Sequence, residues 1–232
     1  MKELIDLKEL VDHQDPVKTL RNLAKEFAGK IAFSTSFSLE DQVITDLIYS
    51  YQIPIRVFTL DTGRLFKETH KVLEETNKAY NQHIQVFFPN NTAVEELLNT
   101  KGNYSFYDSV ENRKECCFIR KVQPLNRALE GVECWITGIR GGQSNNRQNM
   151  DLVEWDNGRG LVKVHPLFAW TLEQTEQYIL DNNVPYNALY NQGYPSIGCE
   201  PCTRAVKVGE PIRAGRWWWE NPTKKECGLH AK

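Results

Sequence analysis

The chain has 232 residues and a formal net charge of −2, and 41% of its residues are hydrophobic. This length suits one domain with its own core, and the evenly mixed charges argue against a protein built mainly to grip nucleic acid. The charged N-terminal sequence predicts no signal peptide, and no apolar run approaches the roughly 18 residues of a membrane span. We therefore expect a soluble cytoplasmic protein that binds neither nucleic acid nor a membrane.

Short apolar runs alternate with helical patterns along much of the chain. Strands are expected at 31–34, 55–60, 84–88, 135–137 and 161–164. Helices are expected at 4–28 (with a second helix starting near Pro16), 40–51, 65–80, 116–129 and 171–181, the last with Thr171 at its N-cap. This alternation is typical of right-handed βαβ units, so we predict an α/β fold with a twisted, mostly parallel sheet flanked by helices.

Three segments carry no such pattern. Residues 99–114 and 141–160 lack a clear period and are expected to be long loops, which are often functional in a compact domain. After Pro185 the chain is expected to be irregular.

Four of the six cysteines fall in two pairs. Cys116 and Cys117 are adjacent, and Cys199 and Cys202 form a CxxC motif. In a cytosolic chain, metal binding or thiol chemistry is the better expectation than a disulfide framework. Four thiolates can hold a zinc ion or an iron–sulfur cluster, and adjacent cysteines suit a cluster because it offers several iron atoms. Structural zinc stays open, as do buried structural thiols beside an unrelated CxxC.

Hydroxyl side chains separate the first expected strand from the helix that follows it. Ser34, Ser36 and Ser38 lie in this run, in front of Glu40 and Asp41. Hydroxyls and N–H groups at a helix N-terminus form an anion site, and α/β sheets place nucleotide phosphates at such a point. A serine-rich N-cap with no ligand explains the pattern equally well.

Basic residues gather in three short segments, and arginine's planar fork matches phosphate or sulfate oxygens. Each residue alone is more often a solvated surface charge. If the fold brings them together, they indicate a small polyanionic ligand. The residues are Arg120, Lys121, Arg140, Arg147, Arg213 and Arg216.

The C-terminal sequence KKECGLH holds Cys227 among two lysines and His230. Neighbouring positive charge lowers the pKa of a thiol, and Gly228 allows the chain to bend. From this segment alone, a frayed terminus with an incidental thiol is the plainer explanation. Cys134 has no partner motif and is expected to be a buried apolar residue.

Together these segments resemble the sulfonucleotide reductase family, and within it the iron–sulfur branch of assimilatory adenylyl-sulfate reductases. The resemblance runs from Ser34 to His230. It rests on SFSLED, LDTGR at 60–64, ECCFIRKVQPL at 115–125, TGIR with QSNNR, SIGCEPCTR at 196–204, RAGRWWW and ECGLH.

The resemblance implies an adenine-nucleotide alpha hydrolase-like fold, with a reductase domain over 1–215 and a tail over 216–232. It implies thioredoxin-dependent reduction of adenylyl sulfate to sulfite and AMP in sulfate assimilation, through an S-sulfocysteine; the reductant is thioredoxin or a similar dithiol protein. A 4Fe–4S cluster would be held by Cys116, Cys117, Cys199 and Cys202. The implied catalytic residues are Cys227, His230 and Lys121, and the implied substrate-binding residues are Ser34, Ser36, Ser38, Asp61, Arg140, Arg147, Arg213 and Arg216.

Several alternatives stay open. The 3′-phosphorylated nucleotide is a second substrate candidate, and a tRNA-thiolating ATP pyrophosphatase of the same fold is a rival. Those pyrophosphatases carry a glycine-rich SGGxDS loop, whereas Thr35, Ser36 and Phe37 fill that region here, which disfavours ATP activation. A non-catalytic zinc module is another rival. The oligomeric state is also open, a homo-oligomer included.

Overall fold

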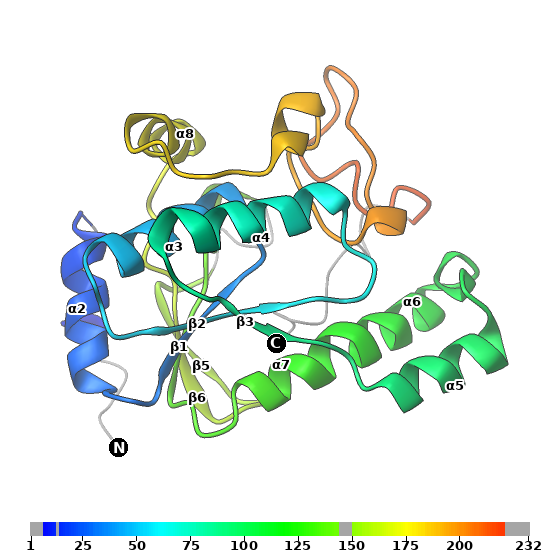
Figure 1. The fold of residues 1–232 in the computed structure, drawn as a ribbon, viewed down its shortest axis with the longest axis horizontal. Coiled ribbons are helices and arrows are strands. Elements are labelled where there is room, and N and C mark those ends of the chain that lie inside the picture. Colours follow the sequence, from blue (N-terminus) through cyan, green and yellow to red (C-terminus); the bar gives the residue numbers. More distant parts are fainter. Residues whose placement is uncertain (1–6, 13, 144–149, 221–232) are drawn as a thin grey trace. The chain divides into compact units, whose positions relative to one another are not determined.

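The computed structural model describes residues 7–12, 14–143 and 150–220, which include a six-stranded sheet (Figure 1). The strand order is β3 (Gln85–Phe87), β2 (Arg56–Leu60), β1 (Ile31–Thr35), β4 (Cys134–Ile136), β6 (Leu161–Val164) and β5 (Val153–Asp156). Strand β1 pairs in parallel with β2 and β4, β4 pairs in parallel with β6, and β5 runs antiparallel to β6. The predicted α/β fold with a mostly parallel sheet is confirmed.

Seven α-helices are described. They are α2 (Pro16–Glu26), α3 (Leu39–Ser50), α4 (Lys67–Tyr80), α5 (Asn91–Lys101), α6 (Val110–Cys117), α7 (Gln123–Ala128) and α8 (Leu172–Asp181). The predicted N-cap of α8 is confirmed, because Thr171 and Gln174 form a reciprocal capping box. No helix in the described ranges combines the length and apolar character that crossing a bilayer requires.

The chain divides into two compact units. The first contains Met1–Thr59, Glu68–Gln85 and Gly131–Asn187, and the second contains Leu60–Lys67, Val86–Glu130 and Ala188–Lys232. The sheet core of the first unit is fully enclosed: Ala32, Phe33 and Ile136 have no exposed surface, as expected for parallel strands covered on both faces. Cys134 is also fully buried, as predicted. The division at residue 215 stays a prediction.

Two of the three segments without a period are not simply loops. Within 99–114, α5 continues to Lys101 and α6 begins at Val110, with the Ser109 hydroxyl accepting from the Asn112 N–H. The pattern was hidden because the buried positions of α6 are Arg113 and Cys116, which form no apolar stripe. Within 141–160, β5 forms the antiparallel edge strand, whose sequence VEWD is too short and too acidic to predict a strand.

The expected single helix over 116–129 is interrupted. A π-helical turn, Phe118–Val122, separates α6 from α7, and Pro124 lies in the first turn of α7. Such a turn is rare and frequently marks a functional site. Here it directly follows the adjacent cysteines.

Candidate functional site

The polar loops after β1 and β4 follow the carboxyl ends of two neighbouring parallel strands of the first unit. The chain continues from β1 to β2 on one side, and β4 lies on the other side, so the strand order changes direction between β1 and β4. Ligands of open α/β sheets bind outside the carboxyl ends of the strands at such a switch point. Ser36 and Ser38 follow β1 there, and Gly138 and Arg140 follow β4.

The loop after β1 is held by its own side chains. The Asp41 carboxylate accepts from the Ser36 N–H at 2.7 Å and from the Ser36 hydroxyl at 2.6 Å. The Phe37 N–H donates to the Thr35 hydroxyl at 3.0 Å, and the Ser38 hydroxyl caps α3. Phe37 has a φ of 60°, which is uncommon for a bulky residue and typical of functional or strained sites. The N–H groups of Ser36 and Phe37, which were expected to bind an anion, therefore donate to side chains of the loop itself.

Asp41 is a buried carboxyl at the switch point. Burial raises its pKa to about 6 against the opposing hydrogen bonds from Ser36, and the neighbouring Glu40 charge adds to the rise. A Cβ at position 138 would lie 2.1 Å from Asp41 Oδ1, so only glycine fits there. The Asp41 carboxyl thus lies between the loops that follow β1 and β4.

Two other predicted substrate-binding residues of this unit have protein partners. Arg140 is buried, and its Nε donates to the Glu40 carboxylate at 2.7 Å. The Ser34 hydroxyl accepts from the Trp135 indole at 2.8 Å. Both side chains are thereby oriented by the first unit itself, and their part in binding a substrate stays a prediction.

The second unit contains all four paired cysteines. Cys116 and Cys117 end α6, and Cys199 and Cys202 bracket a short 3-10 turn. No disulfide joins any of the four to another described residue, and Cys116 and Cys199 are buried. The Cys199 sulfur lies 3.3 Å from the Thr62 hydroxyl, and Cys202 packs on the same apolar cluster as Cys116. The fold therefore gathers the two sequence pairs, 82 residues apart at Cys117 and Cys199, in one compact unit.

The thiols act on one another electrostatically. Burial raises the pKa of Cys202 to about 12, a rise that the nearby Cys199 increases and that Lys121 and Arg216 oppose. Burial also raises the pKa of Cys116, against the pull of the Arg120 guanidinium. Iron or zinc would have to displace these protons, because a metal binds the thiolate. Within the described residues, no three His, Cys, Asp or Glu side chains surround a single metal position.

Two arginines beside the thiols carry unmet hydrogen-bond donors. Arg120 donates from Nη1 to the Thr62 carbonyl at 2.7 Å, and Arg216 donates from Nη1 to the Ile197 carbonyl at 3.1 Å. The Nε atoms of both are buried and have no hydrogen-bond partner among the described residues. Buried donors are normally satisfied, so each orphan requires an explanation. Four thiols with orphaned cationic donors beside them fit an anionic, sulfur-ligated group.

Arg216 also lies against the backbone of the CxxC segment. A Cβ at position 198 would be 2.3 Å from Arg216 Nη2, so the glycine that precedes Cys199 makes room for the guanidinium. The close approach of Gly198 and Arg216 could not be read from the sequence, where they are 18 residues apart.

The remaining predicted residues differ in what the structure says of them. Asp61 is buried and its carboxylate accepts from the Gly63 N–H at 2.8 Å, so it shapes its own turn. Lys121 and Arg213 are half-buried in the second unit. Arg147, Cys227 and His230 lie outside the described residues. Thr62 and Asp41 were missed as single residues, although the LDTGR and SFSLED segments contain them.

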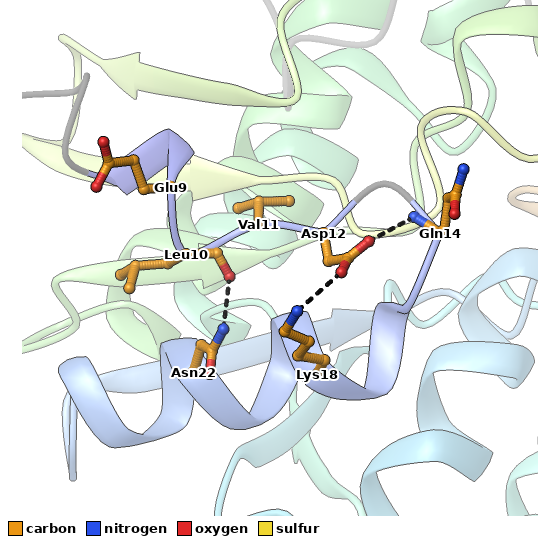
Figure 2. A pocket seen from close by; sticks show the side chains of 7 residues that line it. All are labelled: Glu9, Leu10, Val11, Asp12, Gln14, Lys18 and Asn22. Carbon is orange, nitrogen blue, oxygen red and sulfur yellow. Dashed lines mark hydrogen bonds and ion pairs between the residues drawn. The ribbon is translucent and has the colours of Figure 1, made fainter.

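A hollow of about 320 Å³ near the N-terminal segment holds none of these residues (Figure 2). Its lining residues are Glu9, Leu10, Val11, Asp12, Gln14, Lys18 and Asn22. Figure 2 shows Lys18 reaching Asp12 and Asn22 reaching the Leu10 carbonyl, so its polar groups bind one another. None of its lining residues is a cysteine or a predicted ligand of the substrate.

Comparisons with known proteins point to one family. A family model described as the phosphoadenosine phosphosulfate reductase domain matches residues 30–205. A protein of Agrobacterium fabrum named adenosine 5′-phosphosulfate reductase is 50% identical over 202 residues, covering 87% of this chain and 78% of the relative. A protein of the same name from Neisseria meningitidis serogroup B is 52% identical over 200 residues, covering 85% and 81%. The crystal structure of phosphoadenylyl-sulfate reductase from Candida auris, in a phosphate complex, aligns with a TM-score of 0.73 at 26% identity, covering 89% of this chain and 98% of that one.

Proposed function

The chain belongs to the phosphoadenosine phosphosulfate reductase family, and on that premise we propose that it reduces adenylyl sulfate to sulfite and AMP. Its relatives at about half identity carry the name of an adenosine 5′-phosphosulfate reductase. The reaction would serve sulfate assimilation in the cytoplasm, with thioredoxin or a similar dithiol protein as the reductant.

The observation that carries this proposal is the gathering of the four paired cysteines in one unit with Thr62, Arg120 and Arg216 around them. Cys116, Cys117, Cys199 and Cys202 would hold a 4Fe–4S cluster. The cluster, with all its ligands supplied by protein, would stabilise the unit and add a fixed electrostatic field. The buried Nε donor of Arg120, which has no partner among the described residues, supports a negatively charged group beside it.

Cys227 is the proposed nucleophile, since it lies outside both the cysteine pairs and the core position of Cys134. Its thiolate attacks the sulfur of adenylyl sulfate, a sulfur–sulfur bond forms, and the sulfur–oxygen bond to AMP breaks with the electron pair leaving on AMP. The product on the enzyme is an S-sulfocysteine. Basic residues reduce the repulsion between the thiolate and its anionic substrate and stabilise the leaving phosphate.

The second step regenerates the thiol. A thiolate of the dithiol reductant attacks the Cys227 sulfur, and sulfite leaves with the electron pair. The second thiol of the reductant then displaces Cys227 from the mixed disulfide. Sulfur is reduced by two electrons and the dithiol is oxidised to a disulfide, so the electrons balance.

Lys121, Arg147, Arg213, Arg216 and His230 are the proposed ligands of the phosphosulfate group. Arg216 best supports this role in the second unit, because its guanidinium is buried beside the CxxC segment and its Nε has no partner within the described part of the chain. The nucleoside would lie at the switch point of the first unit, near Ser36, Ser38 and Arg140. Asp61, which shapes its own turn in the second unit, is a further proposed substrate-binding residue. A buried Asp41 carboxyl between the β1 and β4 loops disfavours a pyrophosphate there.

The test is sulfite release from adenylyl sulfate and from its 3′-phosphorylated form, with thioredoxin present. We expect sulfite from adenylyl sulfate, and a higher kcat/KM for this nucleotide than for its 3′-phosphorylated form. A large preference for the 3′-phosphorylated nucleotide would make that compound the substrate. The absence of sulfite from either would refute the proposed reaction.

A further inference from the structure

Arg113 and Glu220 form a buried, doubly hydrogen-bonded ion pair in the second unit. Arg113 Nε donates to Glu220 Oε1 and Nη2 donates to Oε2, both at 2.8 Å. The two side chains are 1% and 3% exposed. Two parallel bonds between a planar guanidinium and a carboxylate fix orientation as well as distance. A buried pair of this kind is weak support for stability, since apolar side chains often stabilise as much, so its geometry is the better guide to its use.

One end of the pair is part of the helix that carries the adjacent cysteines. Arg113 precedes Cys116 by three residues and Cys117 by four on α6. Residues with these spacings lie on the same side of a helix, one turn apart. The helix therefore fixes the position of Arg113 relative to Cys116 and Cys117.

The other end belongs to the segment 216–220, which is joined to the CxxC segment. The Trp217 N–H donates to the Cys202 carbonyl at 3.1 Å, and Arg216 forms a β-bridge with Thr203. The Glu220 N–H donates back to the Trp217 carbonyl at 2.9 Å. This segment thus binds Cys202 through its backbone and, through Glu220, binds Arg113 of the helix that carries Cys116 and Cys117.

Trp217 contacts both arginines of this arrangement. The guanidinium carbons of Arg113 and Arg216 lie 4.7 and 4.8 Å from its ring centroids. Both distances suit a cation–π interaction. Arg113 therefore helps to position Arg216 as well as Glu220, through a ring that is almost fully buried.

We propose that Arg113 and Glu220 are positioning residues that orient the segment 216–220 on the thiol-bearing helix α6. This inference rests on the proposed function, in which Arg216 binds the phosphosulfate group and Cys227, seven residues beyond Glu220, attacks it. The pair orients the Arg216 guanidinium through Trp217, and it fixes the position of Glu220, after which the chain continues toward Cys227. Removing the pair therefore slows the attack of Cys227 more than it weakens the fold.

The experiment replaces the pair by apolar side chains of similar size, Arg113→Met with Glu220→Leu. The matched control is Arg204→Met with Glu210→Leu, which removes another two-bond pair of the same unit, with bonds of 2.8 and 2.9 Å and only partial burial. The readouts are iron content, melting temperature, hydrogen exchange of residues 214–220, and the rate at which adenylyl sulfate adds a sulfite mass to Cys227 in a single turnover.

We expect the Arg113/Glu220 double variant to keep its iron and its melting temperature. We also expect it to form the adduct at least about tenfold more slowly and to exchange faster at 214–220. The Arg204/Glu210 control should match the wild type in adduct formation. A double variant that holds iron and forms the adduct at the wild-type rate overturns the inference.

Two further arms separate the remaining outcomes. If the double variant does not hold iron, Glu220→Gln decides, because it keeps the shape and an acceptor while removing the charge; a wild-type rate in that variant overturns the inference. If the wild type itself yields neither adduct nor sulfite, the proposed function fails. Hydrogen exchange then decides the inference alone, and unchanged protection at 214–220 in the double variant contradicts it.

Discussion

The Asp41 carboxylate binds Ser36 twice, accepting from its N–H at 2.7 Å and from its hydroxyl at 2.6 Å. Both residues lie where the strand order changes direction, and the carboxyl also packs against the backbone of Gly138. The position at which many α/β proteins receive a ligand phosphate is thus next to a carboxyl of the protein itself. This arrangement has a measurable consequence for stability.

The first prediction concerns pH. Burial raises the pKa of Asp41 from 3.8 to about 6, so the protonated carboxyl is favoured in the folded state. The stability that protonation contributes is present below the unfolded pKa and is lost as the pH rises through about 6. The shift corresponds to about 3 kcal/mol of unfolding free energy between a pH well below 3.8 and a pH well above 6. Between pH 5 and 8 the wild type should therefore lose about 1 kcal/mol relative to Asp41→Asn.

Urea unfolding of both proteins at several pH values measures this difference. Asp46→Asn is the matched control, because Asp46 is also a buried carboxyl of α3 but binds Tyr80 instead of the switch-point loop. The control should keep the wild-type decline between pH 5 and 8. A constant difference between wild type and Asp41→Asn over this range would show that Asp41 titrates normally.

The second prediction concerns Gly198. A methyl group at this position would lie 2.3 Å from the Arg216 guanidinium, which must then move away. Gly198→Ala should therefore lower kcat/KM as Arg216→Ala does, by about ten- to a hundredfold, the worth of one charge-assisted hydrogen bond. Gly158→Ala is the control, since its nearest neighbour would be at an ordinary 3.4 Å. Steady-state kinetics showing no loss in Gly198→Ala would mean that the position of Arg216 is unimportant.

The third prediction concerns the cysteines. Anaerobically purified protein should be brown and contain about four iron and four sulfide per chain, and Cys199→Ser should lose both colour and activity because a hydroxyl cannot replace the thiolate ligand. Cys134→Ala, which alters a buried core thiol, should keep the iron. Metal analysis with visible absorbance measures both variants. One zinc and no iron in the wild type would contradict the cluster.

The strands and most helices could be predicted because their apolar periodicity and caps are local. Helix α6 could not, because its inward residues form no apolar stripe: one of them is Arg113, whose carboxylate partner Glu220 lies 107 residues later in the sequence. Strand β5 was missed because an edge strand of four residues carries little periodic signal. It is defined by its antiparallel pairing with β6, which the local sequence does not show.

The candidate site divides in the same way. The cysteine pairs could be found because each is a local motif, whereas the contact of Thr62 with Cys199 joins segments 137 residues apart. Asp41 was visible in the sequence as a helix-start carboxylate, but its burial against Gly138 depends on β1 and β4 being neighbours. Unsatisfied donors such as Arg216 Nε are properties of the fold alone.

The most direct test of the proposed reaction is the mass of the C-terminal peptide after the protein is mixed with adenylyl sulfate and no reductant. The wild type should gain one sulfite mass on Cys227, and thioredoxin should remove it with release of free sulfite. Cys227→Ser should keep its iron and bind AMP but gain no mass, because a serine hydroxyl is far less acidic than a thiol. An adduct on Cys134, or full turnover by Cys227→Ser, would contradict the account.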